Sequence, residues 1–465
     1  MIFSSVEFMF LFLPAVLLAY YLPIKSMAYK NFILLGASLA FYAWGEPIFV
    51  FIMLLSIVVN WFLSLLIEKS SSVLVRKLLL ATSIIWNVFL LGIFKYAGFI
   101  AETLSLLLKN DATTANIALP IGISFFTFQI MSYVIDVYRK TTPAQKNFLL
   151  ITLYISLFPR LATGPIVRYA AVAYELTVRP LEPQHLTRGF VRFTVGLAKK
   201  LLIANYAAFI ADKIFDLAAT GGAISAASAW LGAVAYTVQI YHDFSGYSDM
   251  AVGLGLMFGF NFPENFNYPY IAKSVQDFWS RWHISLSTWF RDYVYIPLGG
   301  NRRSPARVLF NTFIVWLLTG IWHGANWTFI FWGLYYFCFL TLERKTKLHE
   351  RLGKFSHVYA ALVFIFGWVC FRANNLHLAL GYYASMFGFG GGGATDEIFF
   401  TLLKNGAIPL LAGIICSFPV IPTLKAKLPT KLSDALGAIS VATLFIISLM
   451  ACIQNSYSPF IYFNF

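Results

Sequence analysis

The chain has 465 residues, of which 59% are hydrophobic, 18% are aromatic and only 12% are charged. Soluble globular domains carry about 25% charged residues, so too few polar side chains are present here to cover a water-facing surface. This composition excludes a soluble cytosolic enzyme, a nucleic-acid-binding module and a disordered scaffold. It predicts a protein whose main solvent is the lipid bilayer.

The net charge of +14, from 34 Lys and Arg against 20 Asp and Glu, is unusual for so apolar a chain. On a soluble domain it would suggest nucleic acid, but in a membrane protein it indicates cytoplasmic loops that retain Lys and Arg. The four cysteines lie in apolar runs without metal-ligand spacing. We therefore predict small hydrophobic side chains, and neither a metal site nor a disulfide framework.

Apolar stretches close to the roughly 20 residues that a membrane-spanning helix needs recur along the whole chain. We expect an all-α, polytopic membrane protein with about 11 transmembrane helices plus re-entrant and interfacial helices. The predicted spans are Glu7–Leu22, Asn31–Trp44, Pro47–Ile67, Leu78–Ile100, Ile117–Tyr138, Asn147–Thr163, Phe190–Ala211, Ala223–Ile240, Val308–Leu342, Val358–Phe371, Thr401–Pro419 and Ala435–Cys452.

Basic residues alternate between the loops of the first half of the chain. They follow the first, third and fifth predicted spans, whereas the intervening loops hold few cations; the basic residues are Lys25, Lys30, Lys69, Arg76, Lys77, Arg139, Lys140 and Lys146. Because cytoplasmic loops carry the excess of Lys and Arg, this pattern predicts an extracytoplasmic N-terminus. The first apolar segment lacks a basic n-region and a small-residue cleavage site, so we expect a retained span and not a signal peptide.

Tryptophans and arginines interleave in the segment Gln276–Arg307. On one continuous helix, Arg281 and Ser285 would share a polar stripe, and Trp282 would lie on a neighbouring aromatic stripe. His283 lies in the same polar surroundings. Two interpretations stay open: an interfacial helix anchored by tryptophan and arginine, or a helix that lines a polar cavity.

The segment Val308–Leu342 is too long for one span, since a helix of that length would extend about 50 Å. Gly320, Gly324 and Asn326 provide places for a break, and Asn326 would share a face with His323 if the helix continued. An ionisable residue buried in mid-span is a functional hypothesis by default. The alternative is a neutral histidine that hydrogen-bonds between helices.

The polar run Tyr241–Met250 directly follows an apolar segment and contains Asp243. These residues either line a cavity or form a turn with a packing surface of small residues. The sequence contains no HExxH, GxSxG, Walker or Rossmann pattern, which removes several reaction classes.

Several long strings of unusual residues run nearly from end to end of the chain. The first two are M-I-F-S-S-V-E-F-M-F-L-F-L-P at the start and A-S-L-A-F-Y-A-W-G-E-P, which ends at Pro47; four more blocks cover Leu119–Arg139, Thr163–Tyr169, Asp243–Gly255 and Phe260–Tyr270. Two strings contain the histidines discussed above: F-W-S-R-W-H-I-S-L-S-T-W-F-R-D-Y-V-Y-I-P-L-G-G-N-R at Phe278–Arg302 and G-I-W-H-G-A-N-W at Gly320–Trp327. The last two are F-R-A-N-N at Phe371–Asn375 and the closing Y-S-P-F-I-Y-F-N-F. In these strings the chain resembles the membrane-bound O-acyltransferase family, in its bacterial branch of alginate and peptidoglycan O-acetyltransferases.

The resemblance implies a single membrane-embedded domain, residues 1–465, with a catalytic core at approximately 119–342 around a central tunnel. The catalytic histidine of the family carries over to His323 through its W-H-G context. A second family histidine carries over to His283 through R-W-H-I-S-L-S.

The family mechanism implies acetyl-CoA as the acyl-donor substrate, bound from the cytoplasmic side, and no bound cofactor or metal. A neutral His323 would act as general base for an acceptor hydroxyl, or would itself become acylated; both routes stay open. His283, Asn326 or the Trp322 N–H would polarise the thioester carbonyl or orient the base. Further candidates for substrate binding are Arg281, Trp282, Ser285 and Asp243.

The resemblance also implies partners. It predicts a protein of the bacterial cytoplasmic membrane that supplies acetyl groups to a separate extracytoplasmic acetyltransferase, and through it indirectly to a polysaccharide. Lys273, Arg302 and Arg303 are candidates to bind CoA phosphates, although an ordinary positive-inside loop explains these basic residues equally well.

The alternatives to polysaccharide acetylation are D-alanyl transfer to teichoic acid from a carrier protein, a polysaccharide exporter, and a membrane scaffold without chemistry. Whether the acceptor is alginate-like, cellulose or peptidoglycan stays open.

Overall fold

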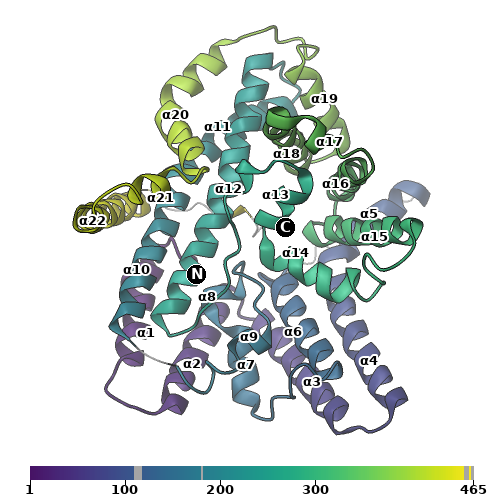
Figure 1. The fold of residues 1–465 in the computed structure, drawn as a ribbon, viewed down its shortest axis with the longest axis vertical. Coiled ribbons are helices and arrows are strands. Elements are labelled where there is room, and N and C mark those ends of the chain that lie inside the picture. The colour runs from purple at the N-terminus through teal and green to yellow at the C-terminus, as the bar shows by residue number, and fades with distance from the viewer. Residues whose placement is uncertain (109–117, 180–181, 455–459, 462–465) are drawn as a thin grey trace. The chain divides into compact units, whose positions relative to one another are not determined.

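The computed structural model describes residues 1–108, 118–179, 182–454 and 460–461 (Figure 1). Within these ranges every regular element is a helix, which confirms the predicted all-α fold. Of the closing motif at Tyr457–Phe465, only Phe460 and Ile461 lie within the described residues. The chain divides into two compact units, and the prediction of one domain with a core at 119–342 stays a prediction.

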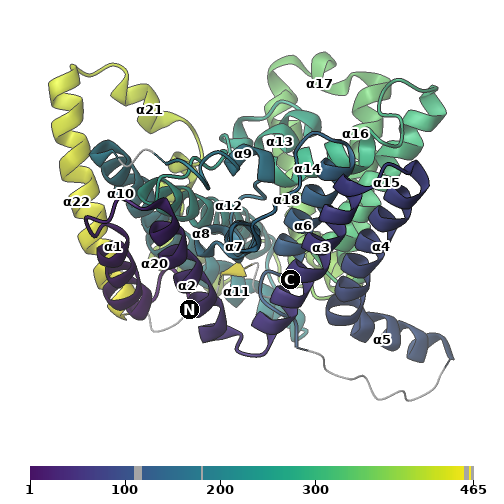
Figure 2. The same cartoon turned by 90° about the horizontal axis from the view of Figure 1, so that it is seen from below.

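The first unit comprises residues 1–193 and 250–263. Its helices α3, α4 and α6 pack against one another, and α2 packs on α7 (Figure 2). Between α3 and α4, the buried Asn60 Oδ1 accepts hydrogen bonds from Ser83 Oγ at 2.6 Å and Asn87 Nδ2 at 2.9 Å, the polar contact typical of membrane helices. The helices are η1 (Phe8–Phe12), α1 (Leu13–Tyr20), α2 (Met27–Gly45), α3 (Phe49–Lys69), α4 (Val73–Leu91), η2 (Gly92–Tyr96), α5 (Ala97–Leu108), α6 (Ile123–Tyr138), α7 (Phe148–Ser156), α8 (Phe158–Leu161), α9 (Tyr169–Val172) and most of α10 (Pro183–Ala198).

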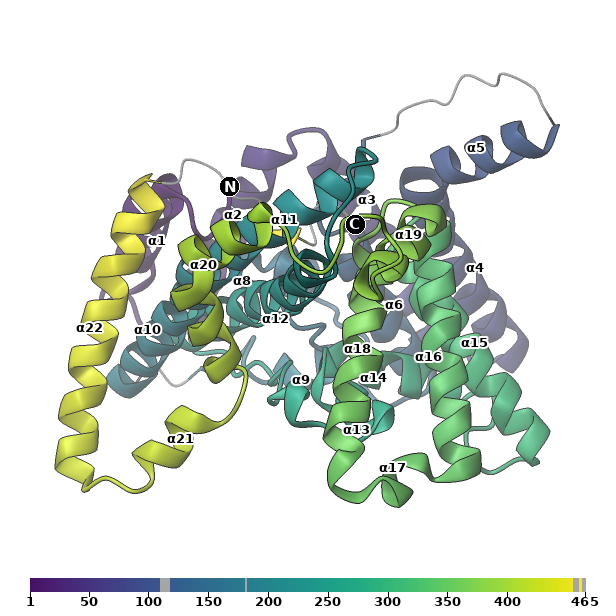
Figure 3. The ribbon, with the colours of Figure 1, turned by 90° about the horizontal axis from the view of Figure 1, so that it is seen from above.

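The second unit comprises residues 194–249 and 264–465 and contains both predicted catalytic histidines. Helix α16 packs on α15 and on α18, as Figures 2 and 3 also show. The helices are η3 (Lys199–Ala204), α11 (Asn205–Ala219), most of α12 (Ala226–Met257), η4 (Pro269–Ile271), α13 (Val275–Arg281), α14 (Ile284–Phe290), η5 (Arg291–Tyr295), α15 (Pro305–His323), α16 (Trp327–Thr346), α17 (Leu348–Arg351), η6 (Gly353–Phe355), α18 (Ser356–Arg372), α19 (Leu376–Met386), α20 (Glu397–Cys416), α21 (Val420–Lys425) and α22 (Thr430–Gln454).

Among the described residues, 6 helices are long and apolar enough to cross a membrane, and shorter apolar helices cover Phe8–Tyr20 and Ile123–Tyr138. These helices make the chain a multi-pass membrane protein, whereas the predicted number of spans stays a prediction. The predicted span Asn147–Thr163 is wrong as a single helix. It consists of α7 and α8, separated by Leu157 with ψ 109°, because Pro159 belongs to a new first turn.

The segment Gln276–Arg307 is not one helix, so the polar stripe predicted to include both Arg281 and Ser285 is wrong. Helix α13 ends at Arg281, and α14 begins at Ile284 after His283, whose φ of 43° is left-handed. The predicted anchoring of this segment by tryptophans is also wrong, because Trp279, Trp282 and Trp289 are buried inside the unit, whereas its position relative to the membrane interface stays a prediction.

The run Tyr241–Met250 lies entirely within helix α12, so the predicted turn is wrong. The accompanying prediction of close packing at small residues is confirmed. A Cβ atom on Gly246 would lie 2.8 Å from the Gly196 carbonyl oxygen, so only glycine permits this helix contact. Packing along the whole length of α12 outweighs the low helix propensity of its glycines, about 1 kcal/mol each.

Helix α13 begins on a buried carboxylate from another helix. Glu343 of α16 accepts hydrogen bonds from the backbone N–H groups of Val275 at 2.7 Å and Gln276 at 3.3 Å. A carboxylate at a helix N-terminus satisfies otherwise unpaired donors and interacts favourably with the helix dipole. It therefore fixes the start of α13 relative to α16.

We expect Glu343→Ala to lower the free energy of unfolding by about 1.5–3 kcal/mol, because buried N–H groups lose a charged acceptor. Thermal unfolding of the purified protein in detergent measures this loss. Glu397→Ala is the matched control, since Glu397 is an exposed acid in the first turn of α20 and its removal should cost less than about 0.5 kcal/mol. Equal losses in the two variants would contradict the capping role of Glu343.

Candidate active site around His323

His323 is the last residue of helix α15 and is only 2% exposed. The predicted break is confirmed: Gly324 is extended, with φ −173° and ψ 159°, and α16 begins at Trp327. The predicted burial of His323 is also confirmed, although the helix ends at the histidine itself. Asn326 therefore does not share a helical face with His323.

Close contact between the backbones of α15 and α16 holds this helix end in place. A Cβ atom on Gly320 would overlap the carbonyl oxygen of Phe329, and one on Gly333 would overlap that of Trp316. Small residues at such a crossing allow membrane helices to approach closely. The glycines thus bring His323 against the first turns of α16.

Aromatic rings from three helices surround the imidazole of His323. The ring centroids lie 5.0 Å from Trp322, 4.9 Å from Trp332 and 5.3 Å from Phe371, each at a nearly perpendicular angle. Trp332 is 0% exposed, so the imidazole is enclosed by apolar surface. In such surroundings water does not compete for the lone pair of a neutral histidine.

The aromatic surroundings also hold buried hydrogen-bond donors without an acceptor in the described part of the chain. These donors are the indole N–H groups of Trp279, Trp332 and Trp368 and the hydroxyl of Tyr336. Buried polar groups in native proteins are almost always paired, so an unpaired group requires an explanation. Donors of this kind suit a ligand that carries carbonyl oxygens.

His283 lies beside the same site and is 1% exposed. Its ring centroid is 5.9 Å from that of Trp322, so this indole lies next to both predicted catalytic histidines. Burial lowers the pKa of His283 to about 3. His283 is therefore a neutral imidazole at neutral pH.

The position of His323 at a helix C-terminus has an electrostatic consequence. The last turn of a helix carries partial negative charge, which favours a nearby cation by about 0.3–1 kcal/mol or more when partly buried. An imidazole that accepts a proton becomes such a cation. The end of α15 therefore suits a histidine that gains positive charge during a reaction.

Two more of the predicted residues lie near this site. Trp282 contacts Trp368 at 4.7 Å between ring centroids, and Trp368 contacts Trp332 at 6.2 Å. Ser285 lies in the first turn of α14, where its backbone N–H donates to Asn265 Oδ1 at 3.1 Å.

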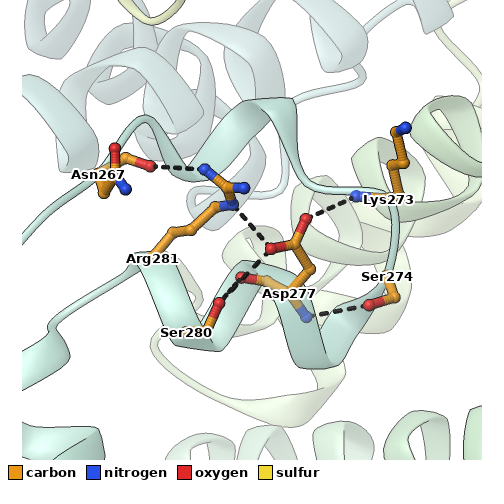
Figure 4. A network of polar contacts seen from close by, with 6 residues as sticks. All are labelled: Asn267, Lys273, Ser274, Asp277, Ser280 and Arg281. Carbon is orange, nitrogen blue, oxygen red and sulfur yellow. Dashed lines mark hydrogen bonds and ion pairs between the residues drawn. The ribbon is translucent and has the colours of Figure 1, made fainter.

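The other three predicted substrate-binding residues take part in structural interactions. Arg281 pairs with Asp277 at 2.7 Å on the partly exposed side of α13, within a polar network that Figure 4 shows. Asn326 caps α16 through the Thr328 N–H at 3.0 Å and donates to the Asn374 carbonyl oxygen at 2.8 Å. Their roles in substrate binding, like that of Asp243, stay predictions.

Asp243 forms a buried ion pair with Lys200 of η3, at 2.6 Å between Oδ1 and Nζ. Its other oxygen, Oδ2, accepts a hydrogen bond from the Ile461 backbone N–H at 2.8 Å. The two side chains are 5% and 2% exposed, so both charges are removed from water. Both carboxylate oxygens thus have partners within the protein.

Trp332, Trp368 and Phe371 are not among the site residues predicted from the sequence. Phe371 lies within the F-R-A-N-N block, which could have indicated it, but tryptophans on an apolar helix resemble ordinary core residues. No group of three or more His, Cys, Asp and Glu side chains in the described ranges is arranged to hold a metal ion.

The fold and the site together define a class: a multi-pass helical membrane protein with two buried histidines at one aromatic site suited to proton and group transfer. The chain belongs to the membrane-bound O-acyltransferase family, whose model matches residues 137–384. It is thus an O-acyltransferase of the membrane.

Curated relatives align with between about half and all of the chain. A probable alginate O-acetylase of Azotobacter vinelandii is 38% identical over 510 aligned positions that cover 100% of both chains. A peptidoglycan O-acetyltransferase of Helicobacter pylori is 36% identical, with 84% of this chain and 80% of the relative covered. A teichoic acid D-alanyltransferase of Bacillus subtilis is 29% identical, over 54% of this chain and 67% of the relative.

Proposed function

We propose that this O-acyltransferase takes acetyl groups from acetyl-CoA on the cytoplasmic side of the bacterial inner membrane for O-acetylation of an extracytoplasmic polysaccharide. The observation that carries the proposal is the enclosure of His323 by Trp322, Trp332 and Phe371 at the end of α15. The unpaired indole donors nearby support a donor substrate with amide and thioester carbonyls.

In direct transfer, the acceptor hydroxyl oxygen attacks the thioester carbonyl carbon. A C–O bond forms, the C–S bond breaks, and the hydroxyl proton passes to a ring nitrogen of His323. The CoA thiolate then leaves and takes up that proton as the free thiol. The helix C-terminus stabilises the transient imidazolium.

In the alternative covalent route, a ring nitrogen of His323 attacks the carbonyl carbon, and CoA leaves as the thiol after proton transfer. The acceptor hydroxyl then attacks the acyl-imidazole, which restores the neutral histidine and yields the ester. Both routes require a neutral His323 in a water-poor site. An acylated protein trapped without acceptor would distinguish them.

The proposal includes a separate extracytoplasmic acetyltransferase that passes the acetyl group to the polymer, and a topology with the N-terminus outside. The relatives named for alginate and peptidoglycan acetylation support a polysaccharide as the final acceptor. The lower identity and coverage of the D-alanyltransferase favour acetyl transfer over D-alanyl transfer from a carrier protein.

The exposed Lys273, Arg302 and Arg303 are candidates to contact CoA phosphates.

The test is transfer of radiolabelled acetyl in inverted membrane vesicles from cells that contain this protein and its partners. We expect acetyl-CoA added to the cytoplasmic face to give alkali-labile label in a polymer inside the vesicles. Vesicles from cells that lack this chain are the control. Label that depends on D-alanyl carrier protein instead of acetyl-CoA would contradict the proposal, and hydrolysis of the labelled polymer identifies the acceptor sugar.

A further inference from the structure

A segment without regular secondary structure, 265–267, runs beside the loop between α13 and α14 that carries His283. The Asn267 N–H donates to the Arg281 carbonyl oxygen at 2.9 Å, and the Ile284 N–H donates to the Asn265 carbonyl oxygen at 3.0 Å. The Arg281 guanidinium adds a hydrogen bond to the Asn267 carbonyl oxygen at 3.3 Å (Figure 4). We call residues 265–267 the clip segment, because these bonds attach it on both sides of His283.

The clip segment compensates for an unfavourable backbone at His283. A residue other than glycine with φ of 43° costs about 1–3 kcal/mol and persists only where its surroundings hold it. The ring of Phe244 lies 4.7 Å from the imidazole at 82° and packs against it. The imidazole of His283 therefore has a defined position before any substrate arrives.

The Asn265 side chain has only one possible amide orientation. Its Oδ1 lies 3.1 Å from the Ser285 backbone N–H, and a backbone N–H only donates, so the atom at this position is the oxygen. The same Oδ1 lies 3.3 Å from His283 Nδ1. Because an amide oxygen only accepts, His283 Nδ1 carries the proton of this hydrogen bond.

We infer that Asn265 is a positioning residue that holds His283 in the Nδ1-protonated tautomer, so that its Nε2 presents a lone pair toward the acyl-transfer site. The inference rests on the proposed function for its catalytic meaning, although the tautomer itself does not. A neutral imidazole has a single N–H, and burial keeps His283 neutral.

This tautomer narrows the role of His283. Polarising the thioester carbonyl needs an N–H directed at its oxygen, and His283 Nε2 carries no proton to donate. As an acceptor, Nε2 instead receives a hydrogen bond from a hydroxyl or N–H in the site, which orients the group that reacts at His323. Carbonyl polarisation is then left to other donors, and the buried indole N–H of Trp332, whose ring centroid lies 4.9 Å from that of His323, is a candidate.

Charged side chains on the two helices beside His283, α12 and α13, form ion pairs. Asp243, next to Phe244 on α12, is neutralised by Lys200, and Arg281 of α13 pairs with Asp277. A carboxylate introduced at position 265 would therefore be a new charge within hydrogen-bond distance of the imidazole. This makes Asn265→Asp a sensitive probe.

The direct test is nitrogen NMR of the protein labelled with 15N-histidine in lipid nanodiscs, with the His283 signals assigned by their loss in His283→Gln. We expect wild type to show a protonated Nδ1 and an unprotonated Nε2, and Asn265→Ala to show a mixture of both tautomers. A protonated Nε2 in wild type would overturn the inference, whether or not the protein transfers acetyl. Failure of wild type to transfer acetyl would overturn the proposed function alone.

Activity gives a second readout in the same preparations. We expect Asn265→Ala to lower kcat about 10- to 100-fold, the range known for loss of the partner that orients a metal-ligating histidine, with KM for acetyl-CoA nearly unchanged. Asn265→Asp keeps the acceptor and raises the pKa of His283, so the acidic limb of its pH–rate profile should move to higher pH.

Asn267→Ala is the matched control, because the backbone of Asn267, and not its side chain, binds Arg281. It should retain wild-type kcat and pH profile. If Asn265→Ala fails to fold, the nitrogen NMR spectrum of wild type still decides the matter, since a protonated Nε2 at His283 would overturn the inference.

Discussion

Replacement of His323 by alanine is expected to lower acyl transfer by at least about 100-fold, the lower end of the contribution of a general base, while the protein still inserts into the membrane. A covalent role would give a still larger loss. The physical reason is the enclosure of the imidazole at the end of α15, where water cannot replace it as proton acceptor. The measurement is transfer of radiolabelled acetyl from acetyl-CoA at equal amounts of inserted protein.

The matched control for this prediction is His377→Ala. His377 lies on α19 and is exposed, so the same chemical change there removes no enclosed proton acceptor and should leave the rate within about twofold. Persistent polymer acetylation in His323→Ala would contradict the catalytic role. An exporter or a membrane scaffold, neither of which needs an acid–base group at this position, would then be favoured.

The buried pair of Lys200 and Asp243 is expected to give the largest effect on stability. Lys200→Met should lower the free energy of unfolding by about 3–5 kcal/mol, because it leaves the Asp243 carboxylate buried without its cation. The double variant with Asp243→Asn should recover most of this loss, since the amide is neutral and its oxygen still accepts the Ile461 N–H bond. Thermal unfolding in detergent measures both variants.

The same double variant decides what Asp243 does. If Asp243 is structural, acyl transfer recovers together with stability in Lys200→Met/Asp243→Asn. Recovered stability without recovered transfer would support the original prediction that Asp243 binds substrate. The control is Glu350→Gln, which removes an exposed ion pair with Lys347 at 3.6 Å and should cost less than about 1 kcal/mol.

Much of the fold followed from local features of the sequence. The scarcity of charge and the long apolar runs were sufficient to predict an all-helical membrane protein. In lipid, a helix satisfies the backbone N–H and C=O groups of such a segment by hydrogen bonds within the segment itself. The break after His323 was predictable, because the apolar segment Val308–Leu342 is too long for one span and contains glycines near its middle. The family strings around His283 and His323 indicated both histidines before any geometry was known.

Local features misled where the chain departs from regular periodicity. The stripe containing Arg281 and Ser285 assumed a continuous helix, but the left-handed His283, attached to the clip segment by Asn265, interrupts it. The polar run of α12 suggested a turn, although helix contacts at Gly246 keep it helical. In both cases contacts with segments distant in sequence outweighed the local preference.

Composition, segment length and family strings are local properties, and they were sufficient to predict a lipid solvent, an all-helical fold and two candidate catalytic histidines. The side chains that surround His323 depend on tertiary packing, because Trp332 and Phe371 come from other helices and resemble ordinary core residues in the sequence. Tertiary packing likewise pairs Asp243 with Lys200 and makes Asn326 the cap of α16. A polar side chain has the same appearance in a sequence whichever group it contacts, because its neighbours depend on the distances between helices.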